Sequence, residues 1–235
     1  MNVIECKEID LSKYGLSGDK KIMFLRIEPD DLSKTIKDIL IELADLSWLS
    51  KFDKEYVKKS MQHNADITCQ ALKNKFYDSS NDPIIEEAGE YIVSVLSKKG
   101  IVESLNHKDI PLAELLGRRK TGNSGFDFFT ENTATQLISC GEAKYIKGVN
   151  AYNTSLLQIN RFISEKKHIS DIILLQSLAE DASLDNLSNN KFGVCSAFST
   201  NAIESNKLIT NICKNTEFVK TLSYEFVILV AVNIA

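Results

Sequence analysis

The sequence predicts an α/β or α+β protein, in which a central mixed β-sheet is flanked by helices. Three observations indicate this class. Apolar stretches of strand length alternate with amphipathic stretches of helix length along the chain. The 235 residues are 43% hydrophobic, which is enough to bury one sizeable core. The chain has only 3 Pro and 10 Gly, and it shows no internal repeat or low-complexity segment.

We expect residues 1–78 to form an N-terminal extension of two strands and two helices, a surface for a partner or for oligomerisation. The β-type runs 2–6 and 21–27 predict a strand pair. The segment Pro29-Asp30-Asp31 precedes apolar residues at helical spacing, which predicts a helix from residue 32 onward, and a second helix is predicted at 53–75. The polar and turn-forming run 78–83 marks a boundary, so a second domain is expected over 79–235.

The second domain is expected to alternate helices and strands. A helix is predicted from residue 84 to residue 96, with Gly100 ending it. Strands are predicted at 126–129 and 136–146 with a turn at 130–133, and a helix follows at 151–163. Further strands are predicted at 171–178, 193–198 and 225–233, with a helix at 201–214.

The composition excludes several classes of protein. The longest apolar run, 226–232, is far shorter than the ~20 residues of a membrane helix. The N-terminus lacks the pattern of a secretory signal, so we expect a cytoplasmic protein without membrane contact. Five scattered cysteines and three histidines argue against a zinc site or a disulfide framework. A bound metal would therefore be held by carboxylates, which favours Mg²⁺ or Mn²⁺.

The net charge of −4 conceals a basic middle region. Residues 117–168 hold eight Lys or Arg and four Asp or Glu, so this window carries +4. A local excess of positive charge suits contact with a phosphate backbone, and it is equally compatible with an ordinary solvated surface. If this region binds nucleic acid, we expect the contacts from its basic side chains: Arg118, Arg119, Lys120, Lys147 and Arg161.

The strongest chemical signal is Asp127 followed by Glu142-Ala143-Lys144. Alternate residues of a strand share a face, so Glu142 and Lys144 point the same way, and a hairpin would bring Asp127 close to Glu142. Two adjacent carboxylates suit a hard cation, and a lysine beside them orients or deprotonates a water molecule. The set predicts metal-assisted attack on a phosphodiester. The structural alternative is a charged pair on a solvated strand face.

This pattern resembles the PD-(D/E)xK superfamily of nucleases, which share the restriction-endonuclease-like fold. The order of helix, strand pair, helix and strand over 84–178 matches, whereas Phe126 stands where the superfamily often has Pro. The resemblance implies that Asp127 and Glu142 bind Mg²⁺, or Mn²⁺, with help from the backbone carbonyl of Ala143. It implies that Lys144 positions or activates the attacking water.

The resemblance also implies two supporting residues. A glutamate from the preceding helix often joins the metal site, and Glu90, Glu87 and Glu86 are the candidates. Helical periodicity places Glu87 nearest the apolar stripe, whereas the Gly89-Glu90 pair matches related nucleases. A polar residue on the following helix is common, and Gln158 occupies that position.

The wider arrangement is similar to the small nuclease subunit of Hachiman-type antiphage defence systems. The matching features are the N-terminal strands and helices, then Gly89-Glu90, Gly125-Phe126-Asp127 and Gly141-Glu142-Ala143-Lys144. This resemblance implies DNA as substrate and a helicase or ATPase as protein partner. Two alternatives stay open: a stand-alone homodimeric restriction or repair endonuclease, and a non-catalytic nucleic-acid-binding scaffold that keeps the fold.

Overall fold

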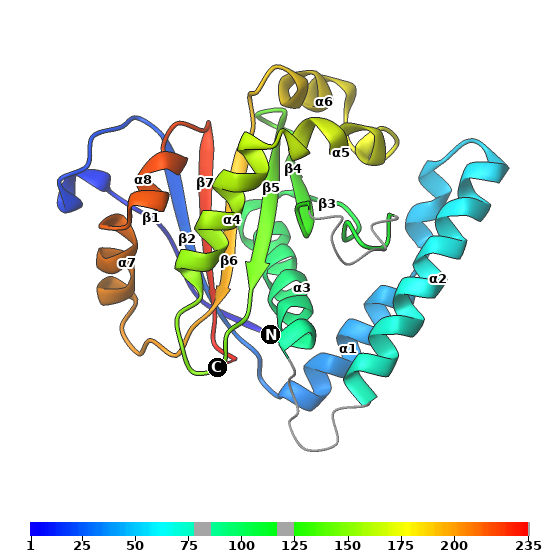
Figure 1. The fold of residues 1–235 in the computed structure, drawn as a ribbon, viewed down its shortest axis with the longest axis horizontal. Coiled ribbons are helices and arrows are strands. Elements are labelled where there is room, and N and C mark those ends of the chain that lie inside the picture. The colour runs from blue at the N-terminus through cyan, green and yellow to red at the C-terminus, as the bar shows by residue number, and fades with distance from the viewer. Residues whose placement is uncertain (78–85, 117–124, 235) are drawn as a thin grey trace.

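The computed structural model describes residues 1–77, 86–116 and 125–234, and it confirms the α/β class (Figure 1). One mixed seven-stranded sheet runs through the molecule in the order β1-β2-β7-β6-β5-β4-β3. The strands are β1 (Asn2–Glu8), β2 (Lys21–Glu28), β3 (Lys108–Asp109), β4 (Phe128–Asn132), β5 (Leu137–Lys144), β6 (Gly193–Ser199) and β7 (Phe226–Val232).

The centre of the sheet is parallel and its margins are antiparallel. Strands β2, β7, β6 and β5 pair in parallel, and β1 and β4 pair antiparallel with β2 and β5. The central strands β6 and β7 are buried along almost their whole length, which explains their nearly continuous apolar sequences. The strand pair of residues 1–28 therefore belongs to the same sheet as the strands of the expected second domain.

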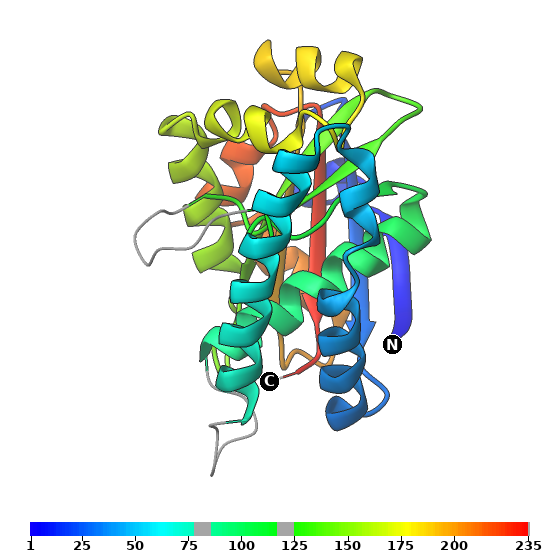
Figure 2. The same cartoon turned by 90° about the vertical axis from the view of Figure 1, so that its right-hand side faces the viewer.

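Helices cover both faces of the sheet (Figures 1 and 2). Helix α3 crosses one face, and α4 with α8 and α7 lies over the other, while α1 and α2 form a hairpin that leans on α3. None of the helices in the described ranges is long and apolar enough to span a membrane. The helices are α1 (Leu32–Ala44), α2 (Glu55–Tyr77), α3 (Glu86–Leu105), α4 (Tyr152–Ser164), α5 (Lys167–Leu175), α6 (Asp181–Ser188), α7 (Ser205–Cys213) and α8 (Thr216–Thr221), with short 3-10 turns η1 (Leu11–Tyr14) and η2 (Ser47–Lys51).

Helix α3 is longer than predicted, because Gly100 does not end it. The helix continues to Leu105. A side chain at position 100 would place its Cβ 2.5 Å from Cδ1 of Ile27 on β2. Glycine is therefore used here to let α3 approach the sheet closely, and the prediction of a helix end was wrong.

The predicted strand at 171–178 is also wrong, because this region forms helix α5. Its buried residues His168, Asp171 and Leu175 recur at three and four positions, as expected for one face of a helix. A short apolar run such as Ile172-Ile173-Leu174-Leu175 fits a strand or a helix equally well. The strand that follows α4 in the sheet is β6.

The hairpin turn lies three residues later than predicted, at 133–136, and β4 extends to Asn132. Polar residues Thr130 and Glu131 had suggested a turn, yet both are fully buried. Glu131 accepts a hydrogen bond from the Glu180 N–H at 2.8 Å and forms an ion pair with Lys108 at 3.0 Å. This polar segment is therefore part of β4, and the Glu131 carboxylate binds the backbone N–H of Glu180, the residue that precedes α6.

Candidate active site

The β4–β5 hairpin brings Asp127 beside the strand that carries Glu142. Asp127 directly precedes β4, and its N–H donates to the Gly141 carbonyl at 2.9 Å. Its carboxylate Oδ2 accepts a hydrogen bond from the Ala143 N–H at 2.7 Å. This second bond fixes the Asp127 side chain against the end of β5, one residue from Glu142.

Lys144 joins this pair to helix α3. Its Nζ lies 3.0 Å from Oε1 of Glu142 and donates a hydrogen bond to Oε1 of Glu90 at 2.9 Å. Glu90 lies in the first part of α3, and its side chain is 32% exposed, against 13% for Lys144. The structure therefore brings together Asp127, Glu142, Lys144 and Glu90 from three separate elements.

Glu142 is the most deeply placed of these groups, with 0% of its surface exposed. Its Oε2 has no hydrogen-bond partner among the residues that the structure describes. Burial raises the pKa of Glu142 well above its ordinary value, the charge of Asp127 raises it further, and the Lys144 ammonium opposes both. A cation beside Glu142 would stabilise its ionised form, so this orphaned oxygen fits a metal ligand.

Lys144 stays protonated at neutral pH. Burial acts to lower the pKa of Lys144, but the carboxylates of Glu142, Asp127 and Glu90 outweigh it and raise this pKa above its ordinary value. An ammonium group donates hydrogen bonds and cannot accept a proton. The arrangement therefore favours a positioning role for Lys144 over the removal of a proton from water.

The backbone at Ala143 supplies a further oxygen to this edge of the sheet. In a strand the N–H and C=O of one residue face the same neighbour. The Ala143 N–H faces Asp127, so its carbonyl faces the same side of β5. On that side the neighbouring strand β4 begins only at Phe128, opposite Gly141. This orientation agrees with the sequence-based hypothesis that the Ala143 carbonyl assists a metal.

The donor set fits a hard cation such as Mg²⁺ or Mn²⁺, because it consists of oxygen atoms. Within residues 1–77, 86–116 and 125–234, no cluster of three His, Cys, Asp or Glu side chains could hold a metal ion. Asp127 and Glu142 place two carboxylates at the end of β5, and the Lys144 ammonium contacts both Glu142 and Glu90. A backbone carbonyl would therefore have to supply a third oxygen.

One contact that the sequence did not reveal sets the distance between α3 and β5, and a second lies between β5 and β4. A Cβ added at Gly89 would lie 2.3 Å from the Tyr145 ring, so glycine is required for the observed approach. A Cβ added at Gly141 on β5 would likewise lie 2.4 Å from the Phe128 ring on β4. Because Gly89 precedes Glu90 and Tyr145 follows Lys144, the first contact determines how close those two charges come.

A chain of hydroxyl groups holds the backbone of Glu142 from the other side. Ser196 Oγ, on β6, donates to Ser155 Oγ on α4 at 2.9 Å, and Ser155 Oγ donates to the Glu142 carbonyl at 2.9 Å. Both serines are buried. Sequence reasoning missed them, since serines on amphipathic helices and strands carry no distinctive signal.

Neither Gln158 nor Arg161 is joined to this cluster by a contact in the described part of the chain. Gln158 is half-buried on α4, one turn beyond Ser155. Arg161 is 54% exposed, lies 3.8 Å from Glu165 and packs its guanidinium over Phe162, and Lys147 is exposed in the loop after β5.

The other candidates lie outside the described residues. Arg118, Arg119 and Lys120 fall in the segment 117–124, and the side chains of Glu86 and Glu87 are not described. Their roles therefore remain sequence-based predictions. The side chain of Glu90, by contrast, is described, and its Oε1 accepts a hydrogen bond from Lys144 Nζ.

Comparison with known proteins adds no relative, because no family model, curated protein or solved structure matches this chain.

Proposed function

We propose that this protein is a metal-dependent nuclease that hydrolyses phosphodiester bonds in DNA. The observation that carries the proposal is the convergence of Asp127, Glu142, Lys144 and Glu90 at the end of β5. A fully buried carboxylate with an orphaned oxygen is costly to folding, and such groups are retained mainly where they serve a site.

Each residue has a chemical task in this proposal. Asp127, Glu142 and the Ala143 carbonyl would hold Mg²⁺ or Mn²⁺, which neutralises the charge that develops on the phosphate during hydrolysis. The Lys144 ammonium donates hydrogen bonds to a water or a phosphate oxygen and holds it in line for attack. Glu90 fixes the direction of the Lys144 side chain.

The biological setting of the proposal comes from the sequence resemblance. We propose a restriction-endonuclease-like core that acts in antiphage defence beside a helicase or ATPase partner. The basic loop with Arg118, Arg119 and Lys120, together with Lys147 and Arg161, would contact the phosphate backbone. A homodimeric stand-alone endonuclease would use the same residues.

One observation favours a second candidate, a nucleic-acid-binding scaffold without catalysis. Lys144 lies within 3.0 Å of both Glu142 and Glu90, so the carboxylates already have a cation inside the protein. In such a scaffold this set would be a buried ion-pair network that stabilises the junction of α3 and β5.

A cleavage assay separates the two candidates. The full-length protein is incubated with linear, circular and single-stranded DNA, and with RNA, in Mg²⁺, in Mn²⁺ and in EDTA. Glu142→Gln and Lys144→Met test the cluster. Lys34→Met, on the exposed start of α1, is the matched control for loss of one positive charge.

The proposal predicts metal-dependent cutting that Glu142→Gln and Lys144→Met each reduce by at least about 100-fold and Lys34→Met leaves unchanged. Cutting that survives both site variants would refute the assignment of the site. Binding of DNA by the wild type without cutting in either metal, with or without an added helicase, would favour the scaffold.

A further inference from the structure

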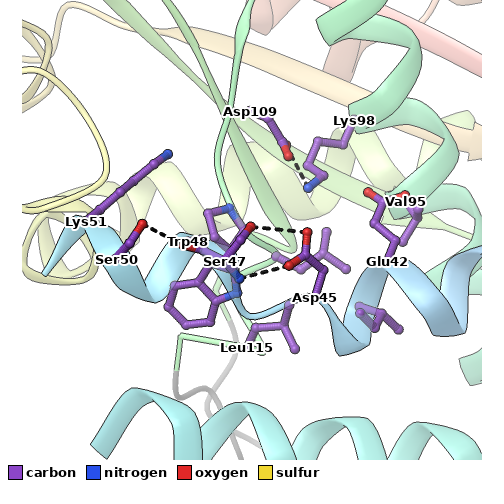
Figure 3. Close-up of a pocket in the computed structure, with 13 residues that line it drawn as sticks. Glu42, Asp45, Ser47, Trp48, Ser50, Lys51, Val95, Lys98, Asp109 and Leu115 are labelled. Atoms are coloured by element: carbon purple, nitrogen blue, oxygen red, sulfur yellow. Dashed lines mark hydrogen bonds and ion pairs between the residues drawn. The ribbon is translucent and has the colours of Figure 1, made fainter. Parts of the chain in front are cut away.

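A cavity of about 390 Å³ lies between the end of α1 with η2 on one side and α3 with segment 109–115 on the other (Figure 3). Its apolar lining comes from Leu43, Trp48, Val95, Pro111, Leu112 and Leu115. Its charged lining consists of three carboxylates and two ammonium groups: Glu42, Asp45, Asp109, Lys51 and Lys98. An apolar cavity with a few converging polar groups is the usual form of a binding site.

Two of the charged groups in this cavity, Lys98 and Asp109, form an ion pair with each other. Lys98 is 5% exposed, and its Nζ lies 2.7 Å from Asp109 Oδ1 and donates to the Ile110 carbonyl at 3.2 Å. The charges of Lys98 and Asp109 therefore balance each other. Neither needs a ligand.

Among the described residues, no cation forms an ion pair with the other two carboxylates, Glu42 and Asp45. Glu42 is half-buried and forms no ion pair within the described ranges. Asp45 accepts hydrogen bonds from the N–H and hydroxyl of Ser47 at 2.9 and 3.1 Å, which leaves its charge uncompensated. Lys51 is exposed, and no dashed line joins it to either acid in Figure 3. The described lining therefore carries net negative charge, with three carboxylates and two ammonium groups.

Trp48 gives an independent indication of a ligand. Its side chain lines the cavity and is only 8% exposed, and its Nε1 has no hydrogen-bond partner among the described residues. A buried indole N–H normally has an acceptor. A ligand that carries both a positive charge and a carbonyl oxygen would satisfy the acids and the indole together.

We propose that this cavity binds an arginine side chain presented by a protein partner. The guanidinium group would pair with Glu42 and Asp45, its methylene groups would pack on the apolar lining, and a peptide carbonyl would accept from Trp48 Nε1. Arginine suits this site better than lysine, because its planar fork offers several donors and is less strongly hydrated.

The cavity is connected to the candidate active site by one short segment. Leu112 and Leu115 line the cavity, and the N–H of Ala113 between them donates to the Asp127 carbonyl at 3.1 Å. The binding proposal does not depend on nuclease activity and is tested without it.

Trp48 makes the test direct, because it is the single tryptophan of the chain. The full-length protein is titrated with the peptide acetyl-Gly-Gly-Arg-Gly-Gly-amide, and the indole N–H resonance and the tryptophan fluorescence are followed. A peptide with citrulline in place of arginine is the neutral isostere, and one with glutamate reverses the charge. The variants are Glu42→Gln, Asp45→Asn and, as matched control, Glu103→Gln on the exposed side of α3.

We expect saturable changes of both signals with the arginine peptide and weaker binding, by about tenfold or more, of the citrulline peptide. Glu42→Gln should raise the Kd for the arginine peptide about tenfold, Asp45→Asn should raise it less, and Glu103→Gln should leave it unchanged. Equal binding of the arginine and citrulline peptides would overturn the proposal. So would full affinity in Glu42→Gln, tighter binding of the glutamate peptide, or no saturable change with any peptide.

Discussion

Lys144 Nζ donates a hydrogen bond of 2.9 Å to Glu90 Oε1, across 54 residues of sequence and from the end of β5 to helix α3. The same ammonium group lies 3.0 Å from Glu142. A single cation therefore bridges an acid on the sheet and an acid on the helix. The approach of α3 to β5 controls this geometry.

Gly89→Ala should separate α3 from β5 and weaken the Lys144–Glu90 bond. The new methyl group would lie 2.3 Å from the Tyr145 ring, so we expect a loss of about 1–3 kcal/mol in the free energy of unfolding, although alanine favours helix. Urea denaturation measures this loss.

Gly100→Ala is the matched control on the same helix. Its Cβ meets the Cδ1 end of the flexible Ile27 side chain, so its cost should stay within about 1 kcal/mol. In the double variant Gly89→Ala/Tyr145→Ala, the losses of unfolding free energy from the two substitutions should be less than additive by about 0.5 kcal/mol or more. Strict additivity would show that the Gly89–Tyr145 contact does not set the helix position.

Glu142→Gln should stabilise the protein while it removes any nuclease activity. The raised pKa of Glu142 means that its contribution to stability is full below the ordinary glutamate pKa and is lost as pH rises toward the folded-state pKa. The glutamine variant has no such loss. The free energy of unfolding of Glu142→Gln, relative to wild type, should therefore grow between about pH 5 and pH 8, to the order of 1–3 kcal/mol.

Thermal melts of Glu142→Gln and wild type across this pH range test the prediction. Glu103→Gln, an exposed substitution on α3, should show no pH-dependent difference from wild type. A glutamine variant that is less stable at pH 8 than at pH 5, relative to wild type, would mean that Glu142 is ionised and well compensated in the fold.

Ser155→Ala should break the hydroxyl chain behind Glu142. It removes the hydrogen bond to the Glu142 carbonyl and leaves the buried Ser196 hydroxyl without its acceptor. We expect a destabilisation of about 1–2 kcal/mol by urea denaturation, and slower cleavage if the proposed site is correct. Ser164→Ala, which removes an exposed bond to the Arg161 carbonyl within the same helix, should cost less than about 0.5 kcal/mol.

His107 should remain neutral to unusually low pH. Burial lowers the pKa of His107 to about 4, and its Nδ1 lies 2.9 Å from Thr130 Oγ1. Its contribution to stability is therefore full above pH 6.5 and is lost as pH falls through about 4. NMR titration of the imidazole carbon-bound protons can resolve it, because the chain has only three histidines. A midpoint near 6.5 would contradict the buried position.

Patterns among residues that are close in the sequence correctly predicted many of the local structural features. The alternation of Glu142 and Lys144 about Ala143 and the hairpin with Asp127 follow from strand geometry, and the structure has both. The helix starting at Leu32 follows from its preceding aspartates, and Asp31 does accept from the Lys34 N–H. Each of these features depends on residues that are neighbours in sequence or joined by one turn.

Errors occurred where a distant residue determines the local structure. Glu131 was expected in a turn because it is polar, but it is a buried strand residue that pairs with Lys108 and holds the Glu180 N–H. Gly100 was expected to end a helix because glycine often does, but it makes room for Ile27. In both cases the deciding partner is on another element.

The sequence alone therefore determined the α/β class, most of its elements and the Asp127, Glu142 and Lys144 candidates. Tertiary structure assigned Lys144's helix partner to Glu90, revealed the serine chain behind Glu142 and formed the Trp48 cavity. The physical reason is that patterning of apolar and polar residues encodes local geometry, whereas the angle and distance between packed elements depend on side-chain shape, as at Gly89 and Tyr145.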